Sequence, residues 1–207
     1  MPDMTFEKAL RKRGLLLIAG VDEAGRGPLA GPVSAAAVIL PNSFHCEGLD
    51  DSKKISKTKR DILFQQITEN KHVSWHQAFA TVEEIHELNI LRATHLAMRR
   101  ALDGLREKPD HCLIDGLPIK NFHYPHDGIV KGDGKSLSIA AASIIAKVSR
   151  DRHMERLDRE FPQYGFARHQ GYGTKEHLEN LRIHGACRHH RQTFQPVAQL
   201  TLSSGDA

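Results

Sequence analysis

The sequence predicts an α/β fold, in which buried strands alternate with helices that cover a sheet. Two patterns lead to this expectation. Short apolar runs, typical of buried strands, recur along the chain. Longer segments between them carry apolar residues three or four positions apart, as helices packed on a sheet do. The 207 residues, of which 40% are hydrophobic, can build the core of one compact domain.

The first apolar run, residues 15–21, is interpreted as a buried strand that ends at the adjacent carboxylates Asp22 and Glu23. The turn Gly25-Arg26-Gly27-Pro28 follows. Its glycines let a ligand approach the backbone, and Arg26 offers a fork suited to phosphate. Ligands of α/β folds bind at the carboxyl ends of strands. The alternative is an ordinary capped strand and turn, and this stretch alone leaves both interpretations open.

The remaining elements follow in order. Further strands are expected at residues 33–40, 73–79, 112–114 and 129–130. Helices are expected at residues 57–69, 81–105, 136–161 and 175–183, with Ser56, Thr81, Ser136 or Ser138, and Thr174 as their caps. The second helix should break near Asn89, and the third begins with side chains so small that it must lie tightly against the sheet. Residues 1–13 are expected to form a short helix or loose arm, and residues 195–207 a frayed tail.

Carboxylates follow three of the predicted strands. Asp22 and Glu23 follow the first, and Asp115 and Asp133 follow two later ones, beside a glycine or a turn. Four acids at one edge of a sheet would repel one another without cations, and Mg²⁺ or Mn²⁺ suits hard carboxylate oxygens. Two such ions form a clamp for in-line displacement at phosphorus. A single Asp is better explained as a turn cap, but the repetition favours phosphodiester chemistry.

Basic residues accompany these acids. Candidates for phosphate contacts are Lys53, Lys54, Lys131, Lys135, Lys147 and Arg150. Charge runs are usually solvated surface, so each pair alone indicates little. The cluster of His184, Cys187, His189 and His190 resembles a zinc site, but no second pair of ligands accompanies it. A basic surface is therefore the preferred interpretation of this cluster.

Composition narrows the class of protein. The net charge of +4 is compatible with a polyanionic partner without demonstrating one. Three scattered cysteines, Cys46, Cys112 and Cys187, indicate reduced thiols. No apolar stretch is long enough to span a membrane, and the start of the chain does not read as a signal peptide. We therefore expect a soluble, cytoplasmic protein without a membrane partner.

Taken together, the motifs resemble bacterial ribonuclease HII over residues 15–198. The segments that carry the resemblance are Gly20-Val-Asp-Glu-Ala-Gly-Arg-Gly-Pro-Leu-Ala-Gly-Pro32, Asp51-Ser-Lys-Lys-Ile-Ser56, Leu113-Ile-Asp-Gly116, Val130-Lys-Gly-Asp133, Ser138-Ile-Ala-Ala-Ala-Ser-Ile-Ile-Ala-Lys147 with Arg150-Asp151, Tyr164-Gly-Phe166 through His169 to Gly171-Tyr172, His190-Arg191 and Phe194. Several separated motifs in the right order are far more specific than one Asp-Glu pair.

The resemblance implies a ribonuclease H-like fold, with a mixed five-stranded sheet flanked by helices. The catalytic core would cover residues 1–161, and a small C-terminal helical part that binds substrate would cover residues 162–207. It implies metal-dependent cleavage of RNA in RNA–DNA hybrids and incision on the 5′ side of single ribonucleotides in duplex DNA. The products would carry 3′-hydroxyl and 5′-phosphate ends. A monomer is expected, and the sequence does not decide whether it contacts a replication clamp.

The resemblance also assigns roles. The residues that would hold two Mg²⁺ or Mn²⁺ ions and act in catalysis are Asp22, Glu23, Asp115 and Asp133. The residues that would bind nucleic acid are Gly25, Arg26, Gly27, Lys53, Lys54, Lys147 and Tyr172. The glycine turn would read the 2′-hydroxyl, chiefly through backbone groups, and Tyr172 would meet the sugar after the ribonucleotide. The alternative for Tyr172 is a side chain buried under the following helix. Gly134 departs from the family pattern, in which many relatives carry Ala or Ser.

Three other functions are compatible with parts of the sequence. Ribonuclease HIII usually carries an extra N-terminal domain, whereas about a dozen residues precede the first strand here. An integrase or resolvase of the same superfamily acts on DNA, which has no 2′-hydroxyl for the glycine turn and Tyr172 to read. A non-catalytic hybrid-binding protein is opposed by the presence of all four acids.

Overall fold

One mixed sheet of five strands organises the computed structural model, which describes residues 1–199. The strands are β1 (Ile18–Ala24), β2 (Val33–Ile39), β3 (Ser74–Ala80), β4 (His111–Asp115) and β5 (His126–Ile129), in the spatial order β3-β2-β1-β4-β5. The pairs β1–β2 and β2–β3 are antiparallel, whereas β1–β4 and β4–β5 are parallel. The predicted mixed sheet flanked by helices is confirmed.

Three parallel strands end at the same edge of the sheet. In the β1–β4 register Val21 pairs with Ile114, so Asp22 and Asp115, each one residue further on, are neighbours. The first strand was expected at residues 15–21, but β1 begins at Ile18 and continues through both acids to Ala24. The two acids are therefore held by the sheet itself rather than by the turn that follows.

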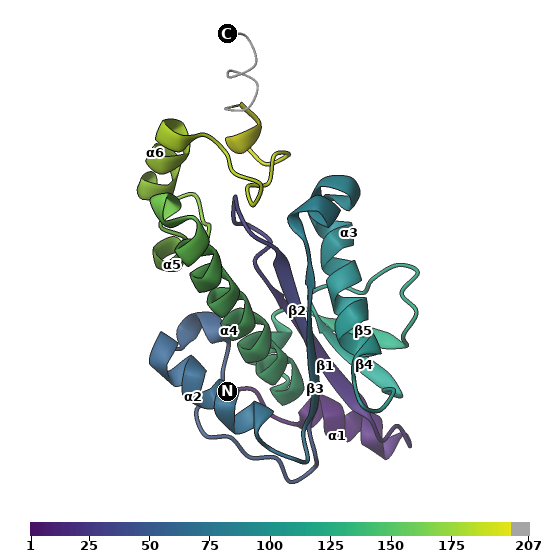
Figure 1. The fold of residues 1–207 in the computed structure, drawn as a ribbon. Coiled ribbons are helices and arrows are strands. Elements are labelled where there is room, and N and C mark those ends of the chain that lie inside the picture. Colours follow the sequence, from purple (N-terminus) through teal and green to yellow (C-terminus); the bar gives the residue numbers. More distant parts are fainter. Residues whose placement is uncertain (200–207) are drawn as a thin grey trace.

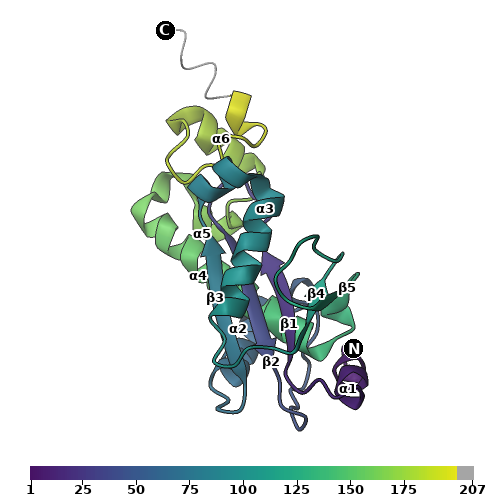
Figure 2. The ribbon, with the colours of Figure 1, turned by 90° about the vertical axis from the view of Figure 1, so that its right-hand side faces the viewer.

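Helices cover both faces of the sheet. They are α1 (Thr5–Lys12), α2 (Lys57–Thr68), α3 (Val82–Asp103), α4 (Leu137–Glu160), α5 (Phe166–His169) and α6 (Lys175–His184). Figures 1 and 2 show α4 and α2 on one face and α3 on the other. The caps Ser56, Thr81, Ser136 and Thr174 and the break at Asn89 are confirmed, and the first turns of the chain form the short helix α1. The short α5 was not expected. None of the helices in residues 1–199 is long and apolar enough to span a membrane.

Alternation along β2 divides the core into two layers. Ala35 and Ala37 face the layer under α3, and Ala36 and Val38 face the layer under α4. At Gly20 of β1, an added Cβ would lie 2.1 Å from the backbone carbon of Ser138, so α4 rests directly on the strand. This confirms that the small first turns of α4 lie tightly against the sheet, and it fixes α4 beside Asp22.

The C-terminal segment packs on the far end of α4 (Figure 1). Tyr164 and Phe166 form a cluster with Met154 of α4, and Val197 packs with Leu29 and Leu181. The expectation of a frayed tail from residue 195 is wrong for residues 195–199, since Val197 is fully buried. The rest of that expected tail, residues 200–207, lies outside the described residues.

Candidate active site

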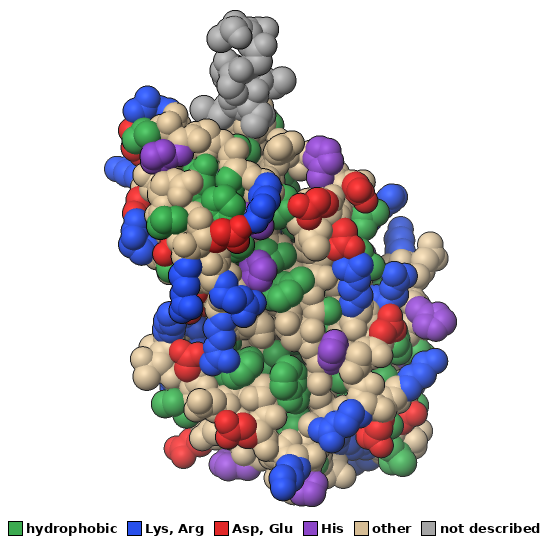
Figure 3. All heavy atoms as spheres, viewed as in Figure 1, with side chains coloured by type: hydrophobic (Ala, Val, Ile, Leu, Met, Phe, Trp, Pro, Cys, Tyr) green, Lys and Arg blue, Asp and Glu red, His purple; other side chains and the backbone are tan. Residues whose placement is uncertain are grey.

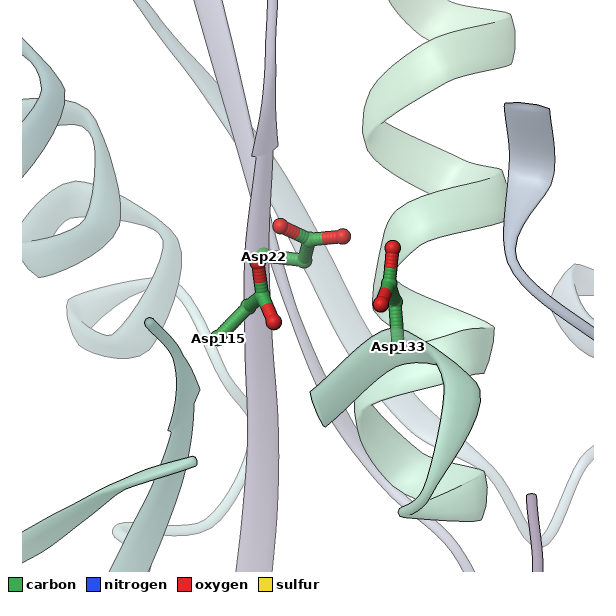
Figure 4. Close-up of side chains that lie close together, drawn as sticks. All are labelled: Asp22, Asp115 and Asp133. Carbon is green, nitrogen blue, oxygen red and sulfur yellow. The ribbon is translucent and has the colours of Figure 1, made fainter. Parts of the chain in front are cut away.

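Three carboxylates converge at the edge where the parallel strands end. Asp22 comes from β1, Asp115 ends β4, and Asp133 sits in the short 3-10 helix Gly132–Gly134 that follows β5 (Figure 4). One oxygen from each lies within 4.8 Å of the others. Lys131, with a φ of 56°, leads the chain out of β5 so that Asp133 turns back toward Asp22. The repetition of acids at strand ends therefore identified a real cluster.

The cluster is electrostatically strained as it stands. Asp22 is 4% exposed, and burial, reinforced by Glu23 and Asp115, holds its pKa well above the ordinary value. Burial and Asp115 also raise the pKa of Asp133. The donors that the protein supplies include the Glu23 N–H to Asp22 (2.7 Å), the Gly132 N–H to Asp115 (2.6 Å) and the Gly134 N–H to Asp133. Close, poorly compensated carboxylate oxygens fit a hard divalent cation.

Glu23, the fourth predicted acid, lies beside this group but outside it. Its Oε1 is 3.3 Å from the guanidinium of Arg26, which partly offsets the burial that raises the Glu23 pKa. Successive residues of a strand point to opposite faces, so Glu23 cannot follow Asp22 into the cluster directly. It is oriented instead toward the glycine turn.

A cavity of about 200 Å³ adjoins the acids. It gathers most of the residues predicted to bind nucleic acid and is lined by Glu23, Ala24, Gly25, Arg26, Gly27, Ser52, Lys53, Ser143, Lys147, Arg150 and Tyr172. The Lys53 ammonium links the cavity to the acids, 3.9 Å from Asp133. Residues from four distant parts of the sequence thus meet at one place.

The predicted lysines divide within this arrangement. Lys53 lines the cavity with an exposed side chain, and Lys147 lines it while paired to Asp151 at 2.6 Å. Lys54 is not among the lining residues and pairs with Asp50 at 3.3 Å. Figure 3 shows Lys and Arg side chains gathered on the side of the molecule where α4 runs, with acids among them.

Two serines of the cavity were missed at the sequence level. Ser143 of α4 donates a hydrogen bond to Ser52, just before Lys53, at 2.8 Å. Both are buried polar residues in otherwise apolar or basic segments. A hydroxyl on the small, apolar face of α4 was the available signal for Ser143.

Arg150 corrects one prediction. It was a candidate for phosphate contact, but it is 1% exposed and its guanidinium donates to the carbonyl oxygens of Pro32, Ala30 and Gln170. An added Cβ at Gly25, where φ is +94°, would lie 1.9 Å from Arg150 Nε. Arg150 is therefore a support behind the turn, and glycine is required there because the guanidinium fills the space.

In the histidine-rich segment the expected basic surface is wrong for His190, whereas His184 and Arg188 are exposed. His190 is buried, and its Nε2 meets His177 Nε2 at 3.1 Å. His177 Nδ1 donates to the Tyr172 carbonyl, so His190 Nε2 must donate to His177, and His190 Nδ1 accepts from the Cys187 N–H. Burial lowers the pKa of His190 to about 4, which keeps this network neutral. Among the described residues, Asp22, Asp115 and Asp133 are grouped so that they could hold a metal ion, and the zinc-site candidates form no such group.

Tyr172 lies at the mouth of the cavity. Its side chain is 47% exposed, which contradicts the alternative of a tyrosine buried under α6. An added Cβ at Gly27 would lie 3.7 Å from its ring, so the ring stands beside the glycine turn. The aromatic face is free to meet a ligand that also touches the turn.

Comparison with known proteins agrees with this geometry. The family model described as Ribonuclease HII matches residues 19–197. Ribonuclease HII of Desulfitobacterium hafniense is 54% identical over 193 residues, covering 93% of this chain and 74% of the relative. Ribonuclease H2 of Pyrococcus horikoshii superposes with a TM-score of 0.74 at 26% identity, covering 92% of this chain and 99% of the other. The enzyme in the PCNA:RNase HII complex of Archaeoglobus fulgidus gives 0.72 at 27%, covering 87% and 96%.

These matches favour ribonuclease HII over the other functions that the sequence left open. They cover the acidic cluster, the cavity and the C-terminal segment alike. The chain belongs to the ribonuclease HII family, whose members are metal-dependent ribonuclease H endonucleases acting on RNA–DNA hybrids.

Proposed function

We propose that this enzyme, beyond cleaving RNA in hybrids, incises duplex DNA on the 5′ side of a single embedded ribonucleotide. The products carry 3′-hydroxyl and 5′-phosphate ends. The observation that carries the proposal is the cavity that joins the glycine turn, Tyr172 and Lys53 to the acidic cluster. A sugar held by the turn and the tyrosine would place a neighbouring phosphate at the acids.

In this proposal, Asp22, Asp115 and Asp133, with Glu23 beside them, hold two divalent ions, Mg²⁺ or Mn²⁺. When bound, such ions activate an attacking water and stabilise the leaving oxygen in an in-line displacement. The support is the donor set: carboxylate oxygens within 4.8 Å of one another, two of them on buried side chains whose pKa is raised. The acids' role is to concentrate negative charge at one point of the sheet edge.

The other residues bind and orient the duplex. The backbone of Gly25, Arg26 and Gly27 reads the 2′-hydroxyl, and the exposed ring of Tyr172 packs on the next sugar. Lys53 and Lys147 contact phosphates. Lys54, paired to Asp50 outside the cavity, is expected to contribute less. Residues 162–199 then act as a substrate-binding part packed on the catalytic core.

The test compares Tyr172→Ala and Tyr172→Phe on two substrates, a duplex with one ribonucleotide and an all-RNA strand paired with DNA. Nick positions are mapped with and without divalent metal, and an all-DNA duplex serves as the substrate control. We expect Ala to lose roughly tenfold more activity on the single-ribonucleotide duplex than on the hybrid, and Phe to lose less, since it keeps the ring. Equal losses on both substrates with a lowered melting temperature would make Tyr172 a packing residue.

A further inference from the structure

Two buried arginines lie behind the glycine turn. Arg191, in the segment after α6, and Arg150 of α4 are each 1% exposed. Arg191 donates to the carbonyl oxygens of Gly25 (2.6 Å), Arg26 (2.8 Å) and Gly31 (2.9 Å). With the three bonds of Arg150, every contact goes to main-chain carbonyl oxygens rather than to carboxylates. The turn is thus held through its backbone by side chains more than a hundred residues away.

This arrangement needs the full guanidinium. Burial and the neighbouring Arg150 lower the pKa of Arg191 to about 9, so the charged side chain depends on its three acceptors. A hydrogen bond to a charged group contributes more to stability than one between neutral groups. A planar fork can meet three acceptors at fixed angles, whereas the ammonium of a lysine cannot reproduce that geometry.

The bonds to Arg191 determine which way the turn's peptide groups face. In a trans peptide the C=O and the next N–H point in opposite directions. The carbonyl oxygens of Gly25 and Arg26 point to Arg191, so the N–H groups of Arg26 and Gly27 point away from it. Within residues 1–199 neither of these two N–H groups donates a hydrogen bond. Two unpaired donors are therefore presented on the ligand side of the turn.

The segment around Arg191 is itself fixed to the turn. The Arg191 N–H donates to the Leu29 carbonyl, and the Gly31 N–H donates to the His189 carbonyl, each at 2.8 Å. The Phe194 ring lies 5.1 Å from the guanidinium carbon. Turn and C-terminal segment form one unit, so the position of Arg191 is transmitted directly to the turn.

We propose that Arg191 is a positioning residue for ribose recognition, which orients the N–H groups of Arg26 and Gly27 toward the 2′-hydroxyl. This inference rests on the proposed function, in which the turn reads that hydroxyl. Loss of the Arg191 bonds lets the peptide groups rotate, so the enzyme distinguishes ribose from deoxyribose less well while its general affinity for duplex DNA remains.

The test uses Arg191→Lys, which keeps the charge, with Arg13→Lys as the matched control, since Arg13 is exposed at the end of α1 and lies outside the substrate-binding part. Affinities for a duplex with one ribonucleotide and for the same all-DNA duplex are measured in Ca²⁺, under conditions without cleavage. We expect the ratio of the two affinities to fall about tenfold in Arg191→Lys, as loss of roughly one hydrogen bond implies. The all-DNA affinity and the control should stay within about twofold of wild type.

Amide hydrogen exchange is measured on the same variants. Faster exchange confined to residues 25–31 supports the inference. An unchanged affinity ratio in Arg191→Lys would overturn it, as would exchange that rises equally through β1 and α6, because Arg191 would then be a general packing residue. A wild-type ratio near one would instead overturn the proposed reading of the hydroxyl by the turn, and this inference with it.

Discussion

The acidic cluster and the C-terminal segment both bury ionisable groups close together. Asp22, Asp115 and Asp133 receive few hydrogen bonds from the protein. Each side-chain nitrogen of Arg191 and His190 has a hydrogen-bond partner, in carbonyl oxygens, the Cys187 N–H and the His177 ring. Arg191 and His190 are therefore paired within the protein, whereas the acidic cluster could hold a cation. Both regions bury ionisable groups. The acidic cluster differs because the protein supplies few hydrogen-bond partners for its carboxylates.

The largest effect is expected when one negative charge is removed from the acidic cluster. Asp22→Asn should lower cleavage of an RNA–DNA hybrid by about a thousandfold or more, because a buried ligand to the metals is lost. Duplex affinity should remain measurable, since basic residues hold the phosphates. Single-turnover cleavage and fluorescence anisotropy check the two statements. Asp127→Asn, in an exposed acid of β5, is the control and should retain activity.

Asp22→Asn should lower activity but raise the thermal stability of the protein without metal. In metal-free buffer Asp22→Asn should unfold at a higher temperature than wild type, since a raised pKa means that the ionised form is destabilised by the fold. Divalent metal should stabilise wild type, by about 2.7 kcal/mol at a hundredfold excess over Kd, and should stabilise the variant much less. Near-normal turnover in the variant would contradict the assignment of Asp22 as a metal ligand.

In the C-terminal segment, protonation of the imidazole network is expected to lower the stability of the fold. A folded pKa of about 4 for His190, against an ordinary 6.5, means that the unfolded chain binds the proton more tightly. Stability is therefore lost as pH falls from 6.5 toward 4, when a proton added to His190 Nδ1 would face the Cys187 N–H from which that nitrogen accepts a hydrogen bond. From pH 7.5 to 5 the loss from His190 should be about 2 kcal/mol.

Urea unfolding of wild type and His190→Gln at both pH values measures this loss. The variant should lose about 2 kcal/mol less than wild type between pH 7.5 and 5, whatever its stability at the higher pH. The acids titrate in the opposite sense, because a raised carboxyl pKa favours folding as pH falls, and their contribution cancels when the two proteins are compared. Identical pH dependence in both proteins would rule out His190 as the titrating group.

Sequence reasoning succeeded where one segment contains the whole signal. The caps Ser56 and Thr81 and the small turns of α4 depend on local sequence, and they were predicted correctly. Acids that recur after strands were likewise informative, although the parallel pairing of β1 with β4 that brings Asp115 beside Asp22 was not predicted.

Sequence reasoning failed where the hydrogen-bond partner of a side chain lies far away along the chain. Arg150 looks like a phosphate ligand in the sequence, and His190 looks like a surface base. Their burial depends on carbonyl oxygens and imidazoles brought together by folding, 120 residues away for Arg150 and Ala30. Charge and residue type cannot reveal whether such acceptors exist. The sequence also left open whether Tyr172 is buried under α6. Its exposure depends on how α6 packs, which the local sequence does not reveal.

The smallest expected effect is on the salt dependence of duplex affinity. The neighbouring residues Lys53 and Lys54 allow a direct comparison, because only Lys53 lines the cavity beside the acids. Lys53 lines the cavity with an 80% exposed side chain, whereas Lys54 pairs with Asp50 outside it. Each lost phosphate contact lowers the slope of log affinity against log salt by about one. Lys53→Ala should show this change between about 50 and 200 mM salt, and Lys54→Ala less than half of it. Equal changes in the two variants would mean that the duplex is held by the diffuse charge of this loop, and that the cavity does not select the phosphate beside the acids.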